Sequence, residues 1–377
     1  MKFQVERETF TEAVTWVART IPNRPAIPVL AGLKIVASEE GKISLGSRDS
    51  DITSHIDIEG DIQIPGEILV NGKLLADICR SLPAKPILFS LEGTKLEIEC
   101  GSARFSMKTM AMDDYSELPA MPPVVGTVDG DQWQEAVSQV TVAASNDDTL
   151  PMLVSVCIEI DGESISLMAT DRYRLAVRDI TWEPVDSTIN KRILVRGSRL
   201  LDIAKSLGTA GSVEISLEES GSSSLIGFSA GGRQNTVQLI EGDYPQVRSL
   251  FPADVSGYAT INRVNMLDAI KRSRLVVEKN SAVRLSFTEG ELVVEAGHGD
   301  AAQASEALEA NLHGEDISLA FNPIFLQEGI SVMNEQNIRL SYTHPTKPAV
   351  ITPENDEGEA DESFRMLLMP IRTFGSN

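Results

Sequence analysis

The 377-residue sequence has few residues of the kinds that carry out chemistry. It contains 3 cysteines and 4 histidines, and no His-Glu-x-x-His or Cys-x-x-Cys spacing that would hold a metal ion. A Gly-x-x-x-x-Gly-Lys-Ser/Thr phosphate loop is also absent. The sequence therefore predicts a protein that is not an enzyme and that needs no cofactor or metal.

Long apolar runs are missing as well. The first residues, Met1 to Glu8, lack the apolar core of a signal peptide, and no segment approaches the ~20 apolar residues of a membrane span. We therefore expect a cytoplasmic protein with no membrane partner. Cys79, Cys100 and Cys157 are widely spaced among apolar residues, which favours buried free thiols over a disulfide or a metal cluster.

Basic residues are outnumbered. The chain has 33 Lys and Arg against 55 Asp and Glu, a formal charge of −22. Such a charge counts against a nucleic-acid partner, because phosphate binding depends on basic patches. That objection holds only if the charges are evenly spread over the surface.

An internal repeat is what the sequence does have. Phe10 to Val14 returns as Trp133 to Val137, and Pro28 to Leu30 returns as Pro151 to Leu153, both about 123 residues later. Met266 to Ile270 begins a fainter third copy. We expect three similar domains, over residues 1–125, 126–253 and 254–377, each near the usual domain size.

Each third contains two predicted helices among strands. Thr9-x-x-Glu12 has the form of a capping box before an apolar stripe, which predicts a helix over 10–20. A second helix is predicted over 72–82, 197–207 and 323–333, and strand-like runs follow every helix. The expected fold class is α+β, with each third a duplicated strand-helix-strands unit.

Basic side chains recur on the solvent faces of these helices. Lys73 and Arg80 lie seven residues apart, opposite an apolar face, and Lys205 takes the place of Arg80 in the second copy. Solvated helix faces ordinarily carry charges of both signs, and Asp77 shows that these do. The pattern alone leaves DNA binding and an ordinary solvated face both open.

Three segments carry a family resemblance. Ala169 to Val177, which reads Ala-Thr-Asp-Arg-Tyr-Arg-Leu-Ala-Val, Leu367 to Arg372 and Arg24 to Leu30 resemble the bacterial DNA polymerase sliding clamp, the beta subunit of the replicative polymerase. The resemblance extends over essentially the whole chain. It implies a DNA clamp fold and a head-to-tail homodimeric ring around duplex DNA, with helices inside and sheets outside. Such a protein is a non-catalytic processivity factor.

The resemblance also implies three sets of site residues. The residues expected to meet DNA are Arg19, Arg24, Lys73, Arg80, Arg199, Lys205, Lys271, Arg272, Arg274 and Lys279. The residues expected to form a pocket for linear peptides are Leu153, Thr170, Arg172, Tyr173, Arg174, Leu175, Pro245, Leu250, Leu367, Met369, Pro370, Ile371 and Arg372. The residues expected at the dimer interface are Arg104, Phe105, Met107, Leu275 and Val276.

Implied partners are double-stranded DNA without sequence preference, a second copy of the chain, the replicative polymerase, the clamp loader, and other polymerases and repair proteins. Arg172-Tyr173 replaces the Gly-His of many family members, which should reshape one end of the pocket. The acidic segment 354–362 is expected to be a mobile solvated excursion. The alternative interpretation is a repeat-built scaffold that binds proteins and never contacts DNA.

Overall fold

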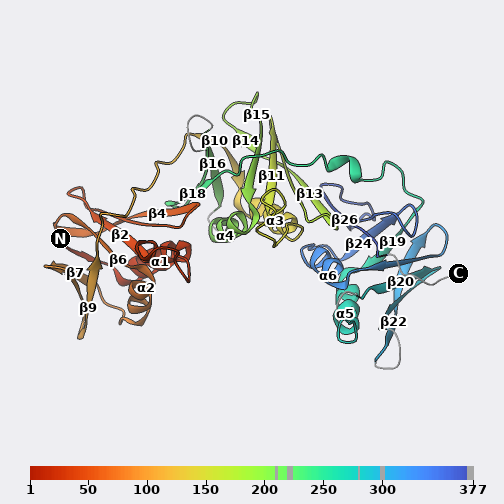
Figure 1. Ribbon diagram of the computed structural model, residues 1–377, viewed down its shortest axis with the longest axis horizontal. Helices are drawn as coiled ribbons and strands as arrows, with labels where there is room; N and C mark the ends of the chain where they lie inside the picture. The colour runs from red at the N-terminus through yellow and green to blue at the C-terminus, as the bar shows by residue number, and fades with distance from the viewer. Residues whose placement is uncertain (209–210, 219–223, 279–280, 298–301, 372–377) are drawn as a thin grey trace. The chain divides into compact units, whose positions relative to one another are not determined.

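The computed structural model describes residues 1–208, 211–218, 224–278, 281–297 and 302–371 (Figure 1). Its contacts divide the chain into two compact units, each built from several stretches of sequence. The first comprises residues 1–131, 183–186 and 202–239, and the second comprises 132–182, 187–201 and 240–377. Two helices, α3 (Gly130–Thr141) and α4 (Gly197–Leu207), run across the division.

In the described residues, the first unit holds α1 and α2 complete, the second half of α4, and a large antiparallel sheet. In its described part the strand order is β14-β10-β16-β17-β18-β4-β3-β2-β6-β9-β8-β7-β1-β5. The elements are β1 (Lys2–Val5), α1 (Arg7–Val17), β2 (Gly32–Ala37), β3 (Lys42–Arg48), β4 (Ile52–Glu59), β5 (Asp61–Ile64), β6 (Gly66–Asn71), α2 (Gly72–Ser81), β7 (Ile87–Glu92), β8 (Lys95–Cys100), β9 (Ala103–Met110), β10 (Val124–Asp129), β14 (Glu183–Pro184), β16 (Ser212–Glu218), β17 (Leu225–Ala230) and β18 (Arg233–Gln238).

The second unit has the same plan. Its described strands follow the order β15-β11-β12-β13-β26-β25-β24-β19-β22-β21-β20-β23. The elements are β11 (Ser155–Asp161), β12 (Ser164–Thr170), β13 (Arg174–Thr181), β15 (Asn190–Arg196), β19 (Gly257–Asn262), α5 (Arg263–Ser273), β20 (Val283–Thr288), β21 (Glu291–Ala296), β22 (Ala304–His313), β23 (Ile317–Phe321), α6 (Pro323–Ser331), β24 (Asn337–Tyr342), β25 (Ala349–Glu354) and β26 (Phe364–Leu368).

Strand pairing joins one sequence repeat to the next inside each unit. In the first unit β4 pairs antiparallel with β18, from Ile52 opposite Val237 to Ile56 opposite Arg233. In the second unit β13 pairs with β26 in the corresponding way, from Arg174 opposite Leu368 to Arg178 opposite Phe364. The sheets therefore continue across the ends of the repeats, and the compact units do not coincide with single repeats.

The apolar faces expected of the helices are buried. Phe10, Val14 and Val17 of α1 are fully covered, and α1 lies beside α2 (Figure 1). Phe10 packs against Phe3 and Phe89, with ring centroids 6.3 and 4.6 Å away. Burial of such side chains contributes about 1.5–3 kcal/mol each relative to exposure. The core of the first unit thus lies between its helices and its strands.

The capping box expected at Thr9 is wrong. The helix α1 begins at Arg7, directly after β1 ends at Val5, and Glu6 is its N-cap without a side-chain hydrogen bond. The backbone N–H of Phe10 donates to the Glu6 carbonyl at 3.0 Å, so Thr9 already lies inside the first turn. The position of the preceding strand sets where the helix starts.

The acidic segment 354–362 is a turn whose tip, residues 355–359, is exposed to solvent, as expected, while its ends are tied to the sheet. Glu354 is buried and accepts hydrogen bonds from Arg339 at 3.1 Å and Thr260 at 2.7 Å. The Asn355 side chain accepts from the N–H groups of Glu357 and Glu359 at 3.0 and 2.8 Å. Paired and hydrogen-bonded carboxylates hold this turn against the sheet, although its tip remains exposed.

Asparagine caps three of the helices. The side-chain oxygen of Asn71 accepts from the Leu74 N–H at 3.0 Å before α2. Asn262 and Asn322 do the same for α5 and α6, at 3.1 and 2.9 Å. Each cap satisfies one N–H group that the first helical turn leaves without a partner.

We predict that Asn71→Ala speeds hydrogen exchange in α2 about fivefold, because loss of an N-cap costs about 1 kcal/mol. The measurement is native-state exchange of the 71–81 segment by mass spectrometry. Asn71→Asp retains an oxygen acceptor and is the matched control, for which exchange should stay near the original rate. Equal acceleration in both variants would contradict a capping role.

Candidate functional site

A hollow of about 490 Å³ opens on the second unit. That volume lies within the ~300–1,000 Å³ typical of ligand pockets. Its walls come from the segment before β11, the end of β12 and the chain before β19. The lining residues are Thr149, Leu150, Pro151, Met152, Leu153, Thr170, Arg172, Pro245, Val247 and Leu250.

Five of the lining residues belong to the expected peptide pocket: Leu153, Thr170, Arg172, Pro245 and Leu250. Sequence reasoning missed Thr149 to Met152 and Val247. A signal was available for Pro151 and Met152, because they belong to the repeat of Pro28-Val29-Leu30. Val247 carries no comparable signal.

Two of the expected pocket residues lie beneath the hollow and do not line it. Leu175 and Leu367 are 1% and 2% exposed. They pack with Val247, Tyr244 and Met168 in one buried apolar cluster. Burial raises the pKa of the Tyr244 hydroxyl, so this side chain stays neutral. The cluster gives the hollow an apolar floor.

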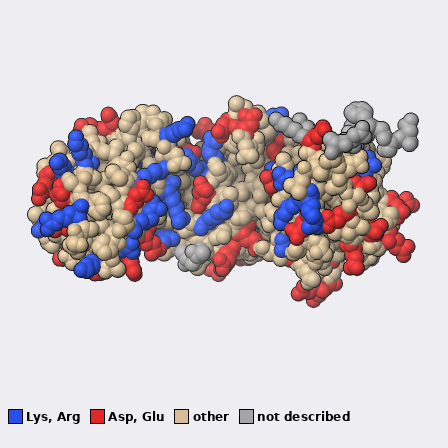
Figure 2. All heavy atoms as spheres, turned by 90° about the horizontal axis from the view of Figure 1, so that it is seen from below, with Lys and Arg blue, Asp and Glu red and all other residues tan. Residues whose placement is uncertain are grey.

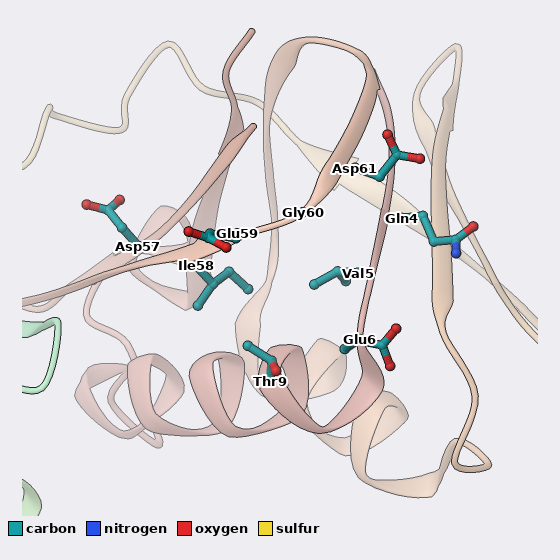
Figure 3. Close-up of a pocket in the computed structure, with 9 residues that line it drawn as sticks. All are labelled: Gln4, Val5, Glu6, Thr9, Asp57, Ile58, Glu59, Gly60 and Asp61. Carbon is teal, nitrogen blue, oxygen red and sulfur yellow. The ribbon is translucent and has the colours of Figure 1, made fainter. Parts of the chain in front are cut away.

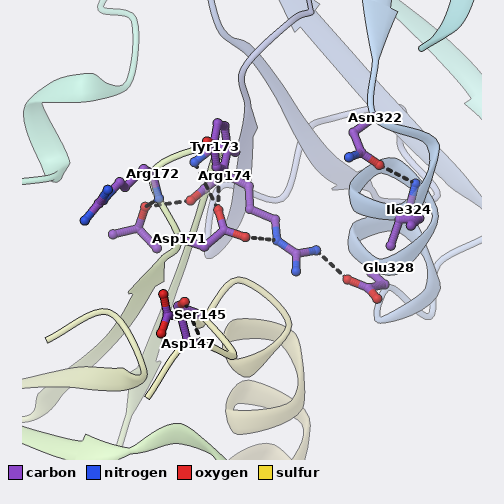
Figure 4. Close-up of polar contacts among 10 residues, drawn as sticks. Ser145, Asp147, Asp171, Arg172, Tyr173, Arg174, Asn322, Ile324 and Glu328 are labelled. Carbon is purple, nitrogen blue, oxygen red and sulfur yellow. Dashed lines mark hydrogen bonds and ion pairs between the residues drawn. The ribbon is translucent and has the colours of Figure 1, made fainter. Parts of the chain in front are cut away.

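A tight turn over residues 170–174 forms one rim. The Asp171 carboxylate accepts from the N–H groups of Tyr173 and Arg174, each at 3.0 Å (Figure 4). The Thr170 hydroxyl donates to the Arg174 carbonyl at 2.6 Å. Arg172 adopts a φ of 80°, the one positive φ at a non-glycine residue in the described chain. Asp171 is thus a turn-forming residue.

Tyr173 and Arg174 face α6 and are not among the residues that line the hollow. The buried Arg174 guanidinium bonds to Asp171 at 2.9 Å and to Glu328 of α6 at 2.6 Å (Figure 4). It also lies 4.3 Å from the centroid of the Phe325 ring, against which Tyr173 stacks. Removing one partner of such a buried pair would leave the other charge buried and without a partner. Arg174 is therefore a structural link to α6.

The last expected pocket residues follow β26 and lie outside the lining. The Met369 N–H donates to the Tyr173 carbonyl at 2.9 Å, and the Ile371 N–H donates to the Ala320 carbonyl at 2.7 Å. Met369 is 43% exposed, whereas Pro370 and Ile371 are half-buried. Arg372 lies outside the described residues.

The basic residues expected to meet DNA are mostly exposed. Figure 2 shows Lys and Arg side chains alternating with Asp and Glu over the face of the first unit that it draws. Lys73 and Arg199 are half-buried, and Lys279 lies outside the described residues. The exposed members are Arg19, Arg24, Arg80, Lys205, Lys271, Arg272 and Arg274.

Several of these cations already have acidic partners. Arg80 pairs with Asp77, Lys271 with Asp268 at 3.1 Å, and Arg272 with Glu306 at 2.5 Å. The Glu306 carboxylate raises the pKa of Arg272 further above its ordinary value. Exposed pairs of this kind stabilise a protein only weakly, so a phosphate group can displace the carboxylate.

The expected dimer residues divide into exposed and buried ones. Arg104 and Phe105 are exposed on β9, and Leu275 is 85% exposed in the turn that follows α5. Val276 beside it is half-buried. Met107 is the exception, because it lies opposite the fully buried Leu96 and is itself only 5% exposed.

A hollow of about 750 Å³ between β1 and the β4–β5 bend has a different character (Figure 3). Glu6, Asp57, Glu59 and Asp61 are among its lining residues. Figure 3 shows Asp57 and Asp61 on opposite sides of it. Four carboxylates repel phosphate. The acidic lining makes this hollow unsuitable for nucleic acid.

Catalytic groups do not assemble in the described part of the chain. No cluster of His, Cys, Asp and Glu there could hold a metal ion, and no helix there is long and apolar enough to cross a membrane. Gly227 to Gly231 has Gly-x-Ser-x-Gly spacing, but Ser229 lies within strand β17 and bonds to Glu214 at 2.6 Å. A nucleophile of that motif requires a strand-to-helix turn.

The three cysteines are buried free thiols, as the sequence predicts. Burial raises the pKa of Cys79 to about 12 and also raises the pKa of Cys157. A thiol with a raised pKa carries little thiolate at neutral pH and reacts slowly.

Family models cover almost the whole chain in three parts. The N-terminal domain of the DNA polymerase III beta subunit matches residues 1–119, the central domain matches 127–246, and the C-terminal domain matches 248–372. The three-part repeat of the sequence thus corresponds to three domains of one family.

Individual relatives agree with the family models. The beta sliding clamp of Streptomyces coelicolor is 45% identical over all of both chains. The beta sliding clamp of Bacillus subtilis is 28% identical over 99% of this chain and all of that protein. Among solved structures, the Bacillus subtilis sliding clamp superposes with a TM-score of 0.91 at 26% identity, covering 99% of this chain and 100% of the other.

A Pseudomonas aeruginosa sliding clamp solved bound to griselimycin shares the fold, with a TM-score of 0.90 at 22% identity over 99% of this chain and 100% of that one. The alignments run the full length of the chain. This chain therefore belongs to the DNA polymerase III beta subunit family, the beta sliding clamps, which are accessory processivity subunits and not catalytic ones.

Proposed function

We propose that two copies of this chain join head to tail in a ring around duplex DNA, in the cytoplasm, and tether the replicative polymerase. The clamp loader, other polymerases and repair proteins would bind the same ring through short linear peptides. The observation that carries the proposal is a pair of strand segments, one in β9 and one in β22, whose outer edges have no strand partner in the described chain. Family membership supports the same assignment.

Two strand segments have a partner on one side only in the described chain. Residues 103–108 of β9 pair with β8, and residues 304–309 of β22 pair with β21. In the order of elements β9 corresponds to β18 and β26, whereas β22 corresponds to β4 and β13. Within the chain, β4 pairs with β18 and β13 pairs with β26. By the same pattern, we expect β22 of one copy to pair with β9 of a second copy.

Charge placement supports DNA as the molecule enclosed. The exposed Arg and Lys side chains on and beside the helices can meet phosphates, while carboxylates farther away than the ~8 Å Debye length contribute little. Non-specific contacts with dissociation constants of ~10⁻⁴–10⁻⁶ M are weak enough to permit sliding. A closed ring then supplies the retention that these contacts lack.

The hollow on the second unit is the proposed peptide site. Seven of its ten lining residues are apolar, from Leu150 to Leu153 and at Pro245, Val247 and Leu250. Leu250 is 55% exposed, although it is large and apolar. An exposed apolar hollow with few polar groups fits the large side chains of a linear peptide. By comparison, griselimycin would bind here.

We predict that Leu275→Asp converts the dimer to a monomer without loss of folding. Leu275 is 85% exposed in the single chain, so a carboxylate there does not lower the stability of the folded monomer. It becomes unfavourable only when a second copy buries it. Sedimentation velocity at micromolar concentration measures the change. Val185→Asp, at a side chain 75% exposed, is the matched control and should remain dimeric. A dimeric Leu275→Asp protein would place the interface elsewhere.

Topological retention on DNA separates a clamp from a scaffold. Loaded by its cognate loader on nicked circular DNA, the protein should stay bound at moderate salt and leave when the circle is cut. Equal release from both forms, by an active loader, would favour the scaffold alternative. Arg24→Glu with Lys205→Glu should slow loading, whereas the control pair Lys95→Glu with Lys347→Glu, also exposed, should not.

For the hollow, we predict that Leu250→Asp weakens griselimycin binding at least about tenfold, because a carboxylate replaces an apolar wall. Surface plasmon resonance provides the dissociation constant. Val255→Asp, at a side chain 50% exposed outside the lining, is the matched control. Unchanged affinity in Leu250→Asp would show that griselimycin binds elsewhere.

A further inference from the structure

We infer that Arg272 belongs to the interface between two copies of this chain and not to the surface that contacts DNA. Its guanidinium, bound to Glu306, lies against Ala103 and Phe105 on strand β9 of the second copy. The inference rests on the proposed ring, and it gives Arg272 a different partner from the one that the sequence predicted. It is supported by the exposure of one helix position, the register of two strand pairs and the size of one side chain.

One position on the opening helix of each repeat differs in exposure. The three helices align on buried apolar residues, which are Phe10, Ala13 and Val14 in α1, Trp133, Ala136 and Val137 in α3, and Met266, Ala269 and Ile270 in α5. Two residues after the last of each set come Trp16, Gln139 and Arg272. Trp16 and Gln139 are 4% and 1% exposed, whereas 57% of the Arg272 side chain is exposed. Within the described chain, the third repeat therefore lacks the cover that this position has in the other two.

In the first repeat, a strand of the next repeat supplies part of this cover. The guanidinium carbon of Arg233, on β18, lies 5.7 Å from the centroid of the Trp16 ring. Arg233 also forms an ion pair with Glu12 of the same helix. The pairing of β18 with β4 places Arg233 there, opposite Ile56. Residues 304–309 of β22 pair with β21 alone in the described chain, so the third repeat has no strand in the place of β18.

Strand β9 corresponds to β18 residue by residue. Ala103 lies opposite Cys100 of β8, and Arg233 lies opposite Ala230 of β17. Each of these pairs closes a hairpin whose turn has two residues. Ala103 therefore occupies the place in β9 that Arg233 occupies in β18.

Strand β22 corresponds to β4 in the same way. Glu306 lies opposite Val294 of β21, and Ile56 lies opposite Leu45 of β3. Val294 and Leu45 match because each is the fourth residue of its strand, and both strands begin with the same alternation of exposed and buried residues. Glu306 therefore occupies the place of Ile56.

These matches fix the register between two copies. Glu306 of one copy lies opposite Ala103 of the second, because the residues at those two places are paired in the first unit. Phe105, two residues farther along β9, then lies opposite Ala304. A shift of one residue would turn Phe105 to the other face of the sheet. The register thus brings Ala103 and Phe105 of the second copy beside Glu306 and the helix that carries Arg272.

The small side chain of Ala103 fits this arrangement. Between β4 and β18, the guanidinium beside the helix comes from the strand, at Arg233. Between two copies it comes from the helix: Arg272 donates from Nε and Nη2 to the two carboxylate oxygens of Glu306, at 2.9 and 2.5 Å. Because protein interfaces of this kind are packed as closely as interiors, the residue opposite must be small to leave room for the pair. Ala103 meets that requirement.

Phe105 supplies an aromatic surface beside the same pair. Its ring is large and apolar, yet the residue is 37% exposed in the single chain. A guanidinium stacks favourably on an aromatic face, more so where water is excluded. The two hydrogen bonds to Glu306 already satisfy much of the Arg272 charge before the second copy binds. Burial of the complete pair is therefore tolerable, whereas burial of either charge alone is not.

The test compares a single and a double substitution. Arg272→Met should raise the dissociation constant of the dimer at least about tenfold, because the Glu306 carboxylate would be buried without its partner. Arg272→Met combined with Glu306→Met removes both charges and should restore the constant to within about threefold of the original. Sedimentation velocity over a dilution series of the full chain gives each constant, and circular dichroism checks that each protein is folded.

Loading on nicked circular DNA separates an interface residue from a DNA contact. The double variant keeps the net charge of the chain and its interface, so it should load at the original rate. A residue that contacts phosphate would instead make the double variant load slowly. Lys271→Met is the matched control for dimer formation, because Lys271 is the preceding residue of α5 and also an exposed cation with a carboxylate partner. It should leave the dissociation constant of the dimer unchanged.

Cross-linking tests the register directly. Phe105→Cys combined with Ala304→Cys should give a covalent dimer under mild oxidation, because residues directly opposite each other in paired strands are close enough for a disulfide. Phe105→Cys combined with Ser305→Cys should give little, because Ser305 lies on the other face. The native cysteines are buried and do not compete.

The outcomes separate the inference from the proposed ring. If the original chain is monomeric at every concentration, the ring is wrong and the inference with it. If the original chain dimerises and Arg272→Met dimerises equally well, or if the double variant dimerises but loads slowly, the interface role of Arg272 is overturned and the ring stands. Cross-linking through residue 305 in place of 304 overturns the register in the same way. A dimer weakened by Arg272→Met and restored in the double variant, with normal loading, supports the inference.

Discussion

Backbone hydrogen bonding between strand edges is the interaction on which this structure depends. A backbone N–H or C=O group at a sheet edge that has no hydrogen-bond partner is unfavourable once it is buried. An open edge can also pair with a strand of another chain. In both units, the edge strand of one repeat is hydrogen-bonded to a strand of the next repeat. These pairs are β4 with β18 and β13 with β26. Such pairing needs little side-chain specificity. The two junctions accordingly have the same pairing although the paired residues differ.

Electrostatics in this protein depends on position more than on total charge. A formal charge of −22 coexists with helices whose exposed faces carry Arg and Lys. Water and salt attenuate distant charges, so a phosphate beside such a face responds to the nearest few residues. The acidic hollow beside Asp57 and the largely neutral hollow beside Leu250 illustrate the same principle. Each surface of the molecule has its own electrostatic character.

Periodicity in the sequence predicted the helices closely: the expected 197–207 is identical to α4, and 72–82 differs from α2 by one residue. These helices have long apolar stripes, and burial of the stripes stabilises the helical conformation. The sequence predictions fail where contacts with segments far away in the sequence determine the local structure. Glu6 starts α1 because a strand ends at Val5, and Arg174 turns to α6 because Glu328 and Phe325 lie there. The hollow's floor is likewise formed by β13 and β26 together.

The three cysteines have a practical consequence. All of them are buried, and burial holds the thiols of Cys79 and Cys157 in their protonated form. A cysteine introduced at any exposed position would consequently be the only thiol that a maleimide dye readily reaches. Fluorescent labelling for single-molecule work on this protein can therefore proceed with the native cysteines in place.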